Sequence, residues 1–436
     1  MKRIIAVLLG LVLVLGCMVP AFAEDAPAAV KSGAYLVADA GSGAPLFGRR
    51  WTEPCDPSAL TKLMTLGMAC EKAGGCWDTP LTVSAQTSED FAAAGASHIS
   101  LQAGESAPLK DFLYAVMLSG ANDACNVLGE YISPDGTLSG GIAAMNARAA
   151  ALGLEHTHFV NCHGMTQQGQ TSTPEELMQI LHWALAQPGF SEIFACAEPY
   201  TMEAAGAQSE PRTFQLKDRL RLPGPGQNEA ITGSKGGYTD AAGRSYACLA
   251  QKDGKAVLCV VMQAPDEVFL AQDMSAILDH AFTMYQLVTV PAQTVPAPVT
   301  VQGGGQPLGT ARAVIPAFSV LLHTSLAEDA VKLKATDTLY TMGGPLPRAQ
   351  FSIAGGGMQA DGQLWQEMQL AGLEGIFSSV PGQPLARGKK SENKWKIPGP
   401  DSPIWVPGLI LLVTLLLLTV IKVWQVRRKR LHQGTK

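Results

Sequence analysis

Apolar residues are distributed unevenly along the chain, and the first apolar run lies at its start. Lys2 and Arg3 precede a run from Ile4 to Val19, which ends before Ala21-Phe22-Ala23. A charged start, a short apolar run and an A-x-A pattern are typical of a cleaved secretory signal. We therefore predict that residues 1–23 are a signal peptide. The alternative, lipidation at Cys17, is less well supported because the preceding residues fit a lipobox poorly.

A second apolar run lies near the other end of the chain. Ile404 to Ile421 carries no charge, and Trp405 and Trp424 flank it. About 20 apolar residues cross a bilayer core as a helix, and tryptophans prefer its interfaces. Residues 404–424 are predicted to be a transmembrane helix. The basic tail 425–436 is then cytoplasmic by the positive-inside rule, which predicts a single-pass protein of the cell membrane with its ectodomain outside.

The pattern between these two runs predicts two domains. Residues 24–287 mix helical and strand periodicities, which indicates an α+β domain. A Pro-rich linker, 288–298, leads to short β-like runs broken by glycines over 299–380, which indicate a small all-β domain. Residues 381–403 are polar and rich in Pro, Gly and Lys, as in a flexible stalk.

The segment 55–69, CDPSALTKLMTLGMA, predicts a helix that begins near Asp56 and Pro57. Its apolar residues form one stripe, so we expect one buried face. Lys62 lies off that stripe, close to the positive end of the helix. Taken alone, this lysine would be expected to reach out to solvent.

Two later segments change that interpretation. Over 114–131, an apolar helix ends near Leu118 and another begins near Asp123, which places Asn122 in the loop between them. Within 232–262, alternating runs at Ser245–Leu249 and Val257–Met262 flank Asp253-Gly254 and predict a β-hairpin. Lys235 lies just before this hairpin, and Gly236 and Gly237 allow a ligand to approach the backbone closely.

The order of these segments resembles the serine acyl-enzyme family of low-molecular-mass penicillin-binding proteins and β-lactamases, with the motifs S-x-x-K, S-x-N and K-T-G. The D-alanyl-D-alanine carboxypeptidase branch is most similar, on LTKLMT, ANDA, GGYTDAAG and NCHGM…TSTPEEL. VADAGSGAPLF, residues 37–47, resembles the strand pair before the nucleophile helix. The resemblance implies the α+β fold of the penicillin-binding proteins and β-lactamases. It implies that the chain removes the terminal D-Ala from peptidoglycan stem peptides. It also implies a serine nucleophile, with lysines that move protons and bind the substrate carboxylate.

The chain departs from all three motifs at their hydroxyl positions. Counting from Lys62, the nucleophile position is Ala59; counting from Asn122, the second serine position is Gly120; and Gly236 replaces the threonine. An alanine methyl group cannot form an acyl ester. Our first hypothesis is therefore a pseudoenzyme that binds stem peptides or wall partners.

Alternative hypotheses retain the chemistry. Ser58, Ser119 and Ser234 each lie one residue before a motif position, and Ser58 is an alternative nucleophile for an active carboxypeptidase. Adjacent helical residues point about 100° apart, so Ser58 would reach Lys62 only if the helix start were rewound. A β-lactam sensor would need the same acylation, so we expect at most weak β-lactam binding. His163 is expected to be structural, and Gly169-Gln170 stands where the family has Gly-His.

Composition excludes some other functions. The net charge is −5. Residues 1–23 carry two cations and residues 402–436 carry six, with no acids in either, which leaves about −13 between them. Such a chain is not expected to bind nucleic acid. The cysteine spacing lacks a zinc pattern, and no metal or cofactor is predicted. Cys125, Cys248 and Cys259 read as buried thiols, and one pair among Cys55, Cys70 and Cys76 is a candidate disulfide.

Overall fold

The computed structural model describes residue 27 and residues 29–375, apart from 88–90, 204–209, 295–298, 304–305, 327–329, 335–338, 342–347, 356–357 and 368. The predicted signal peptide, stalk, transmembrane helix and tail lie outside the described residues. Within the described part, no helix combines the length and the apolarity that crossing a membrane would require.

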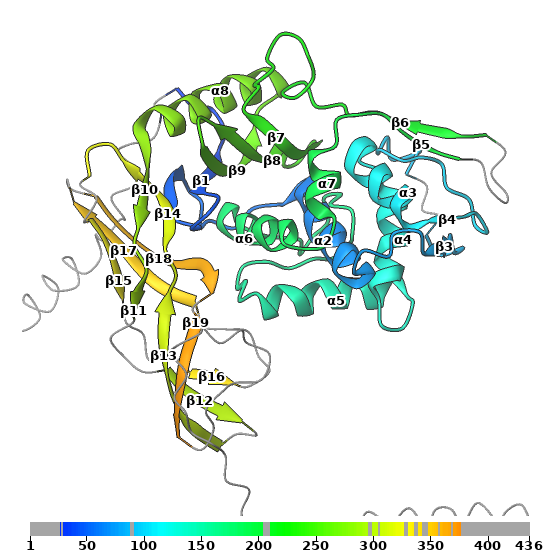
Figure 1. The fold of residues 1–436 in the computed structure, drawn as a ribbon. Helices are drawn as coiled ribbons and strands as arrows, with labels where there is room; N and C mark the ends of the chain where they lie inside the picture. Colours follow the sequence, from blue (N-terminus) through cyan, green and yellow to red (C-terminus); the bar gives the residue numbers. More distant parts are fainter. Residues whose placement is uncertain are drawn as a thin grey trace, which may run out of the picture. The chain divides into compact units, whose positions relative to one another are not determined.

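A five-stranded sheet in the order β2-β1-β9-β8-β7 forms the centre of the α+β domain (Figure 1). Each neighbouring pair is antiparallel, and β7 lies at one edge. Every residue of β1 is buried, which explains its nearly continuous apolar sequence. The strands are β1 (Ala34–Asp39), β2 (Pro45–Arg49), β7 (Ile231–Thr239), β8 (Gly243–Lys252) and β9 (Lys255–Ala264).

Helices cover both faces of this sheet. On one face, alternate residues of β1 such as Val37 pack with Met274 and Ile277 of α8 (Glu267–Met284). On the other face, Leu36 belongs to a core that contains the remaining helices. These are α2 (Thr61–Ala73), α3 (Leu109–Tyr114), α4 (Asn122–Ile132), α5 (Leu138–Ala151), α6 (Pro174–Leu185) and α7 (Phe190–Ala195). Short strand pairs lie beside them: β3 (Pro80–Thr82) with β4 (Ser106–Pro108), and β5 (Tyr200–Met202) with β6 (Arg212–Phe214).

Local sequence accounts for several element boundaries. Asp253 and Gly254 both have positive φ, at 51° and 75°, as the tight turn between β8 and β9 requires. The hairpin predicted from Ser245–Leu249 and Val257–Met262 is therefore confirmed, as is the strand pair over 37–47. Helix α6 begins in TSTPEEL, where the Thr173 hydroxyl accepts from the Glu176 N–H and Pro174 takes the first helical position.

The start of α2, the helix that carries Lys62, differs from the prediction. Residues Ser58–Leu60 form a 3₁₀ turn, η2, and the α-helix begins at Thr61. The Asp56 carboxylate accepts from the Ser58 N–H at 2.8 Å, so it still satisfies a donor at this end. The expectation of a single buried face was wrong: residues 61–70 of α2 are all buried, because α4, α5, α6 and α7 all contact this helix.

The C-terminal part of the described chain is made of β-strands, as the sequence predicted. The first of these strands, β10 (Tyr285–Val290), extends into the segment expected to be the Pro-rich linker and pairs with β14 (Phe318–His323). The other strands form two further sheets: β11 (Gln293–Thr294), β12 (Val299–Gly303), β13 (Gln306–Ile315), β16 (Leu339–Thr341) and β19 (Gln369–Gly375) in one, and β15 (Val331–Lys334), β17 (Arg348–Gly355) and β18 (Met358–Glu367) in the other.

All eight cysteines of the described residues are free thiols. The candidate disulfide among Cys55, Cys70 and Cys76 is therefore not formed. Cys70 is buried within α2 and Cys76 is exposed, while the Cys55 thiol lies 3.5 Å from the Met262 sulfur.

Candidate active site

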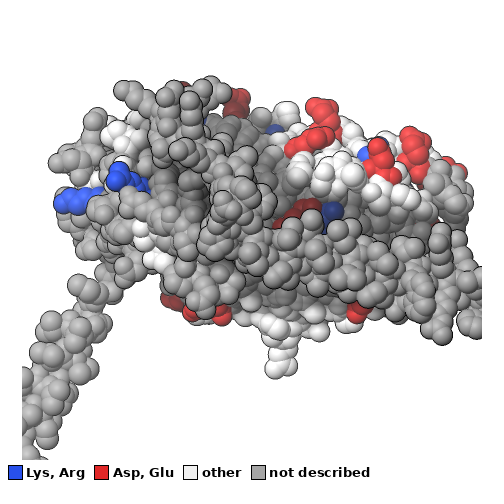
Figure 2. Space-filling model, turned by 60° about the horizontal axis from the view of Figure 1, so that its bottom comes forward, with Lys and Arg blue, Asp and Glu red and all other residues white. Residues whose placement is uncertain are grey.

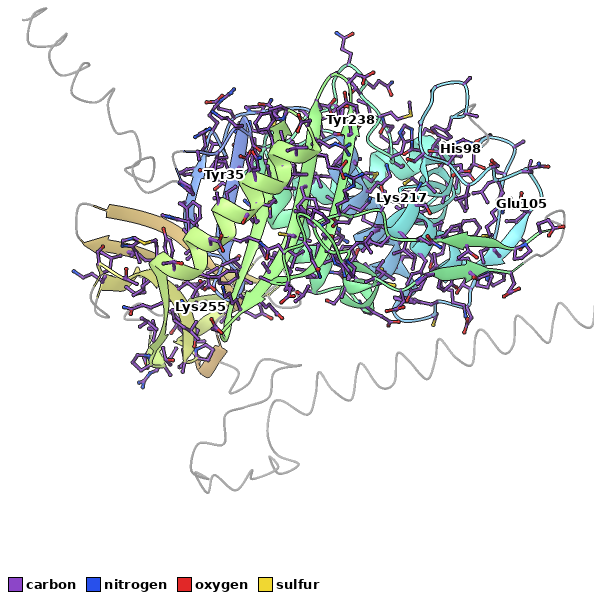
Figure 3. The ribbon with its side chains drawn as sticks, turned by 90° about the horizontal axis from the view of Figure 1, so that it is seen from above. Tyr35, His98, Glu105, Lys217, Tyr238 and Lys255 are labelled. Carbon is purple, nitrogen blue, oxygen red and sulfur yellow. The ribbon has the colours of Figure 1, made fainter. Side chains whose placement is uncertain are left out.

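A cleft of about 1070 Å³ lies between β7 and the helical part of the α+β domain. Figure 3 labels two of its lining residues, Tyr238 at the end of β7 and Lys217 on the segment that leads into this strand. The residues predicted from the three motifs line this cleft together, whereas Ser58 does not. They are Ala59, Lys62, Gly120, Asn122, Lys235, Gly236 and Gly237.

Lys62 lines the cleft and is only 4% exposed. Its Nζ donates to Asn122 Oδ1 at 2.7 Å and to the His163 carbonyl oxygen. Burial lowers the pKa of Lys62, because the charged amine loses its hydration. The lysine therefore does not reach solvent, and it joins α2, α4 and the loop that contains His163.

Asn122 is positioned by the N-terminus of α4, of which it is the first residue. Its backbone N–H donates to the Ser97 carbonyl at 2.9 Å. The next residue, Asp123, accepts from the N–H groups of Ile99 and Leu101, each at 3.0 Å. The loop that contains Ser97 is thus fixed to the same helix end as the motif asparagine.

Lys235 supplies the second buried amine. It is 6% exposed, and its Nζ donates to the Gly236 carbonyl at 3.1 Å. Burial, and then the nearby charge of Lys62, lower the pKa of Lys235 to about 8. Near neutral pH most of these side chains are still protonated, so the cleft offers a cation to an anionic ligand.

His163 contributes to the site through its backbone. Its carbonyl oxygen accepts from Lys62, and its Nδ1 accepts from the Met165 N–H at 3.2 Å. Burial, followed by the charge of Lys62, lowers the pKa of His163 to about 3, so the ring is neutral. These contacts fit the structural role expected for this histidine.

The nucleophile position faces the cleft and ends in a methyl group. A Cβ built on Gly237 would lie 2.2 Å from the Ala59 Cβ, so the methyl group sits directly against the Gly237 backbone. A side chain at residue 237 would collide with it. The residue that the spacing from Lys62 picked out therefore lines the cleft, and its side chain carries no hydroxyl.

Ser58 does not replace the missing nucleophile in this structure. Its φ of 49° is unusual for a residue other than glycine, and its side chain is fully buried. Among the described residues its Oγ has no hydrogen-bond partner, and its carbonyl lies against Gly164. The helix start is rewound into a 3₁₀ turn, yet the Ser58 hydroxyl still does not bond to the Lys62 amine.

A π-helical turn precedes the second motif. Residues Ala115–Ser119 form this turn, η3, and Gly120 comes next with φ of 69°. A π-helical turn holds one more residue than an α-helical turn, and this one ends directly before Gly120. A Cβ built on Gly120 would lie 3.9 Å from Lys235 Nζ and 3.9 Å from Ser97 Oγ. Gly120 thus occupies the second serine position, beside the second lysine.

The third missing hydroxyl has a packing explanation. A Cβ on Gly236 would lie 2.8 Å from the ring of Tyr246, which pairs with it on β8. The Tyr246 hydroxyl donates to Asp218 Oδ2 at 2.7 Å, and the Ser234 hydroxyl donates to the same oxygen at 2.5 Å. Tyr246 therefore fills the space into which a threonine side chain would project.

Sequence reasoning missed Ser97, Asp218 and Tyr246. Asp218 precedes β7 by many residues, and Ser97 lies in an irregular loop, so neither belongs to a periodic pattern. Tyr246 lies within the predicted hairpin, but its place beside Gly236 follows from the pairing of β7 with β8, which the turn at Asp253-Gly254 does not determine. Within the described residues, no group of three His, Cys, Asp or Glu side chains could hold a metal ion.

The comparisons with known proteins agree with this geometry. A family model for D-alanyl-D-alanine carboxypeptidase matches residues 21–266. The chain belongs to the D-alanyl-D-alanine carboxypeptidase family. Members of this family act on peptidoglycan stem peptides and bind β-lactams.

Relatives in this family are distant. DacF of Bacillus subtilis is 26% identical over 295 residues, which cover 66% of this chain and 72% of DacF. DacC of Escherichia coli is 28% identical over 275 residues, which cover 61% of this chain and 64% of DacC. Both carry the name D-alanyl-D-alanine carboxypeptidase.

Solved structures of the same fold cover the α+β domain. A D-alanyl-D-alanine carboxypeptidase from Mycobacterium tuberculosis superposes with a TM-score of 0.52 at 23% identity, over 61% of this chain and 96% of that one. The Streptomyces K15 DD-transpeptidase gives 0.53 at 22% identity, over 58% and 98%. At this identity the likeness establishes the penicillin-binding-protein fold.

Restoring the motif threonine is expected to destabilise the fold. Gly236→Thr would force its Cβ against the Tyr246 ring, and overpacking of this kind costs about 1–3 kcal/mol. Denaturant unfolding measures the loss. The double variant Gly236→Thr with Tyr246→Leu should recover part of it, and Tyr246→Leu alone controls for removal of the ring. Unchanged stability of Gly236→Thr would contradict the packing explanation.

The lowered pKa of Lys235 predicts a pH-dependent stability. Because the folded pKa is about 8 and the ordinary value is 10.5, the unfolded chain binds more protons between them, and stability rises with pH across that window. Replacing Lys235 with Met should reduce this rise in the free energy of unfolding. Lys217→Met, at an exposed lysine of the same cleft, is the matched control. If the free energy of unfolding changes with pH by the same amount in wild type and in Lys235→Met, the lowered pKa of Lys235 is refuted.

Proposed function

We propose that this chain is an inactive carboxypeptidase homologue, which binds the C-terminal end of peptidoglycan stem peptides without cleaving it. The observation that carries the proposal is the Ala59 methyl group, which faces the cleft against Gly237 where a nucleophilic oxygen would be needed. Without that oxygen no acyl-enzyme forms at this position. In a serine protease, loss of the nucleophile alone costs about 10⁶-fold in kcat.

The rest of the cleft remains suited to an anionic peptide end. Lys62 and Lys235 are buried amines, and the Asn122 amide lies beside the first of them. Cationic side chains outnumber acidic ones in the lining: Lys62, Lys217, Arg219, Lys235 and Arg244 against Asp218, Asp240 and Glu267. Over the whole sequence acidic residues outnumber basic ones, with a net charge of −5, and acidic side chains are scattered over the face drawn in Figure 2. The cationic lining favours a ligand with a carboxylate, which the cleft would attract although the protein as a whole is acidic.

The alternative is an active carboxypeptidase that uses Ser58. The buried hydroxyl of Ser58, without a partner among the described residues, speaks against it. Its N–H is also held by Asp56, so turning the side chain towards Lys62 would require the 3₁₀ turn to change. Without a reactive hydroxyl at residue 58 or 59, a β-lactam would occupy the cleft only as a weak, non-covalent ligand.

Labelling by a fluorescent penicillin separates these two functions. The purified wild-type chain is expected to show no covalent label after denaturing electrophoresis. The Ala59→Ser variant is expected to gain label, because it returns the oxygen to a cleft that keeps both amines. The matched control Ser58→Ala, combined with Ala59→Ser, should label equally well. Label on the wild-type chain that Ser58→Ala abolishes would show that the enzyme is active through Ser58.

We also propose that the cleft acts outside the cytoplasmic membrane, with the chain anchored by residues 404–424. The support is the sequence: an apolar run with a basic flank at one end and a signal-like segment at the other. Protease added to intact spheroplasts should degrade the α+β domain while a tag on the C-terminal tail stays protected. Protection of the domain in intact spheroplasts, with digestion after lysis, would place it in the cytoplasm instead.

A further inference from the structure

The space beside Gly120 is bordered by the hydroxyl of Ser97, a residue that belongs to none of the three motifs. The Cβ that a serine would carry at residue 120 would lie 3.9 Å from Lys235 Nζ and 3.9 Å from Ser97 Oγ. The hydroxyl of Ser97 therefore approaches, from a different segment, the same region in which the motif serine would place its own. That region is also the one that the second lysine faces.

Ser97 is held in place through its backbone. Its carbonyl accepts from the Asn122 N–H at 2.9 Å, and Asp123 fixes Ile99 and Leu101 of the same loop. None of these contacts involves the Ser97 side chain. The position of this hydroxyl is thus set by the start of α4, and its removal leaves the anchors of the loop intact.

The Ser97 side chain is available to a ligand. Ser97 is exposed and lines the cleft. Its hydroxyl makes no hydrogen bond to any other residue that the structure describes, and a hydroxyl can both donate and accept. Ser234, by contrast, is buried and donates to Asp218, so its hydroxyl is already engaged.

Gly120 itself is poorly suited to carry a serine. Its φ of 69° is in the left-handed region, which glycine adopts freely and side-chain-bearing residues rarely adopt. The π-helical turn before it ends in this conformation. A glycine here, with the hydroxyl supplied by the adjacent loop, keeps the unstrained backbone and the polar group together.

We propose that Ser97 supplies the hydroxyl that the second motif has lost, and that it hydrogen-bonds a peptide held beside Lys235. This inference rests on the proposed function, because it concerns a ligand in the same cleft. It assigns a ligand-binding role to a residue outside the three motifs. It also predicts that the loss at residue 120 is compensated within the fold, unlike the loss at residue 59.

The test measures binding of a fluorescently labelled peptide that ends in D-Ala-D-Ala, by fluorescence anisotropy with the full chain. Ser97→Ala is expected to weaken binding by about three- to tenfold, as the loss of one neutral hydrogen bond predicts. Ser97→Thr, which keeps a hydroxyl, should bind within about twofold of wild type on the same basis. The matched control is Ser100→Ala, an exposed serine of the same loop that is not part of the cleft lining.

Thermal unfolding of each variant separates ligand contact from a structural role, because Ser97→Ala should leave the midpoint unchanged. Equal affinity of Ser97→Ala and wild type would overturn the inference while the proposed function stands. So would a loss of affinity in Ser119→Ala without one in Ser97→Ala, since this would assign the hydroxyl to the neighbouring motif position. If the wild-type chain does not bind the peptide, the proposed function and the inference both fail.

Discussion

The buried amine of Lys62 is the interaction on which the rest of the site depends. An ammonium group removed from water needs strong acceptors, and here the Asn122 amide oxygen and the His163 carbonyl provide them. These two acceptors come from α4 and from the loop before α6, so the lysine ties three segments together. The cleft is therefore kept in shape by a hydrogen-bonded lysine whether or not a nucleophile stands beside it. This explains how a chain can lose the attacking oxygen and still keep the architecture of the site.

The three lost hydroxyls have different physical settings. At residue 236 a tyrosine fills the vacated space and is tied to Asp218, so the change is built into the packing of β7 and β8. At residue 120 the backbone is left-handed, and a neighbouring loop presents Ser97. At residue 59 the methyl group simply meets Gly237. Neighbouring groups thus accommodate the changes at residues 236 and 120, whereas at residue 59 the adjacent Ser58 hydroxyl does not bond to Lys62.

Much of the fold could be predicted from the sequence. The alternating pattern on either side of Asp253-Gly254 predicted the hairpin. The motif spacings counted from Lys62, Asn122 and Lys235 picked out residues that line one cleft. The burial of α2 on all sides could not be predicted, because it depends on which helices surround it. The 3₁₀ and π-helical turns also escaped prediction, since each differs from an α-helix by one residue in its hydrogen bonding. Ser97 and Asp218 reach the site through loops, where no periodicity reports contacts between distant residues.

The most direct measurement of the central claim is equilibrium dialysis of the full chain against a diacylated tripeptide ending in D-Ala-D-Ala, with analysis of the peptide by mass spectrometry. We predict that the protein retains an excess of peptide on its side, that this excess falls when Lys235 is replaced with Met, and that every recovered peptide is intact. Steady accumulation of free D-alanine and of the shortened peptide, lost on Lys62→Ala, would contradict the claim.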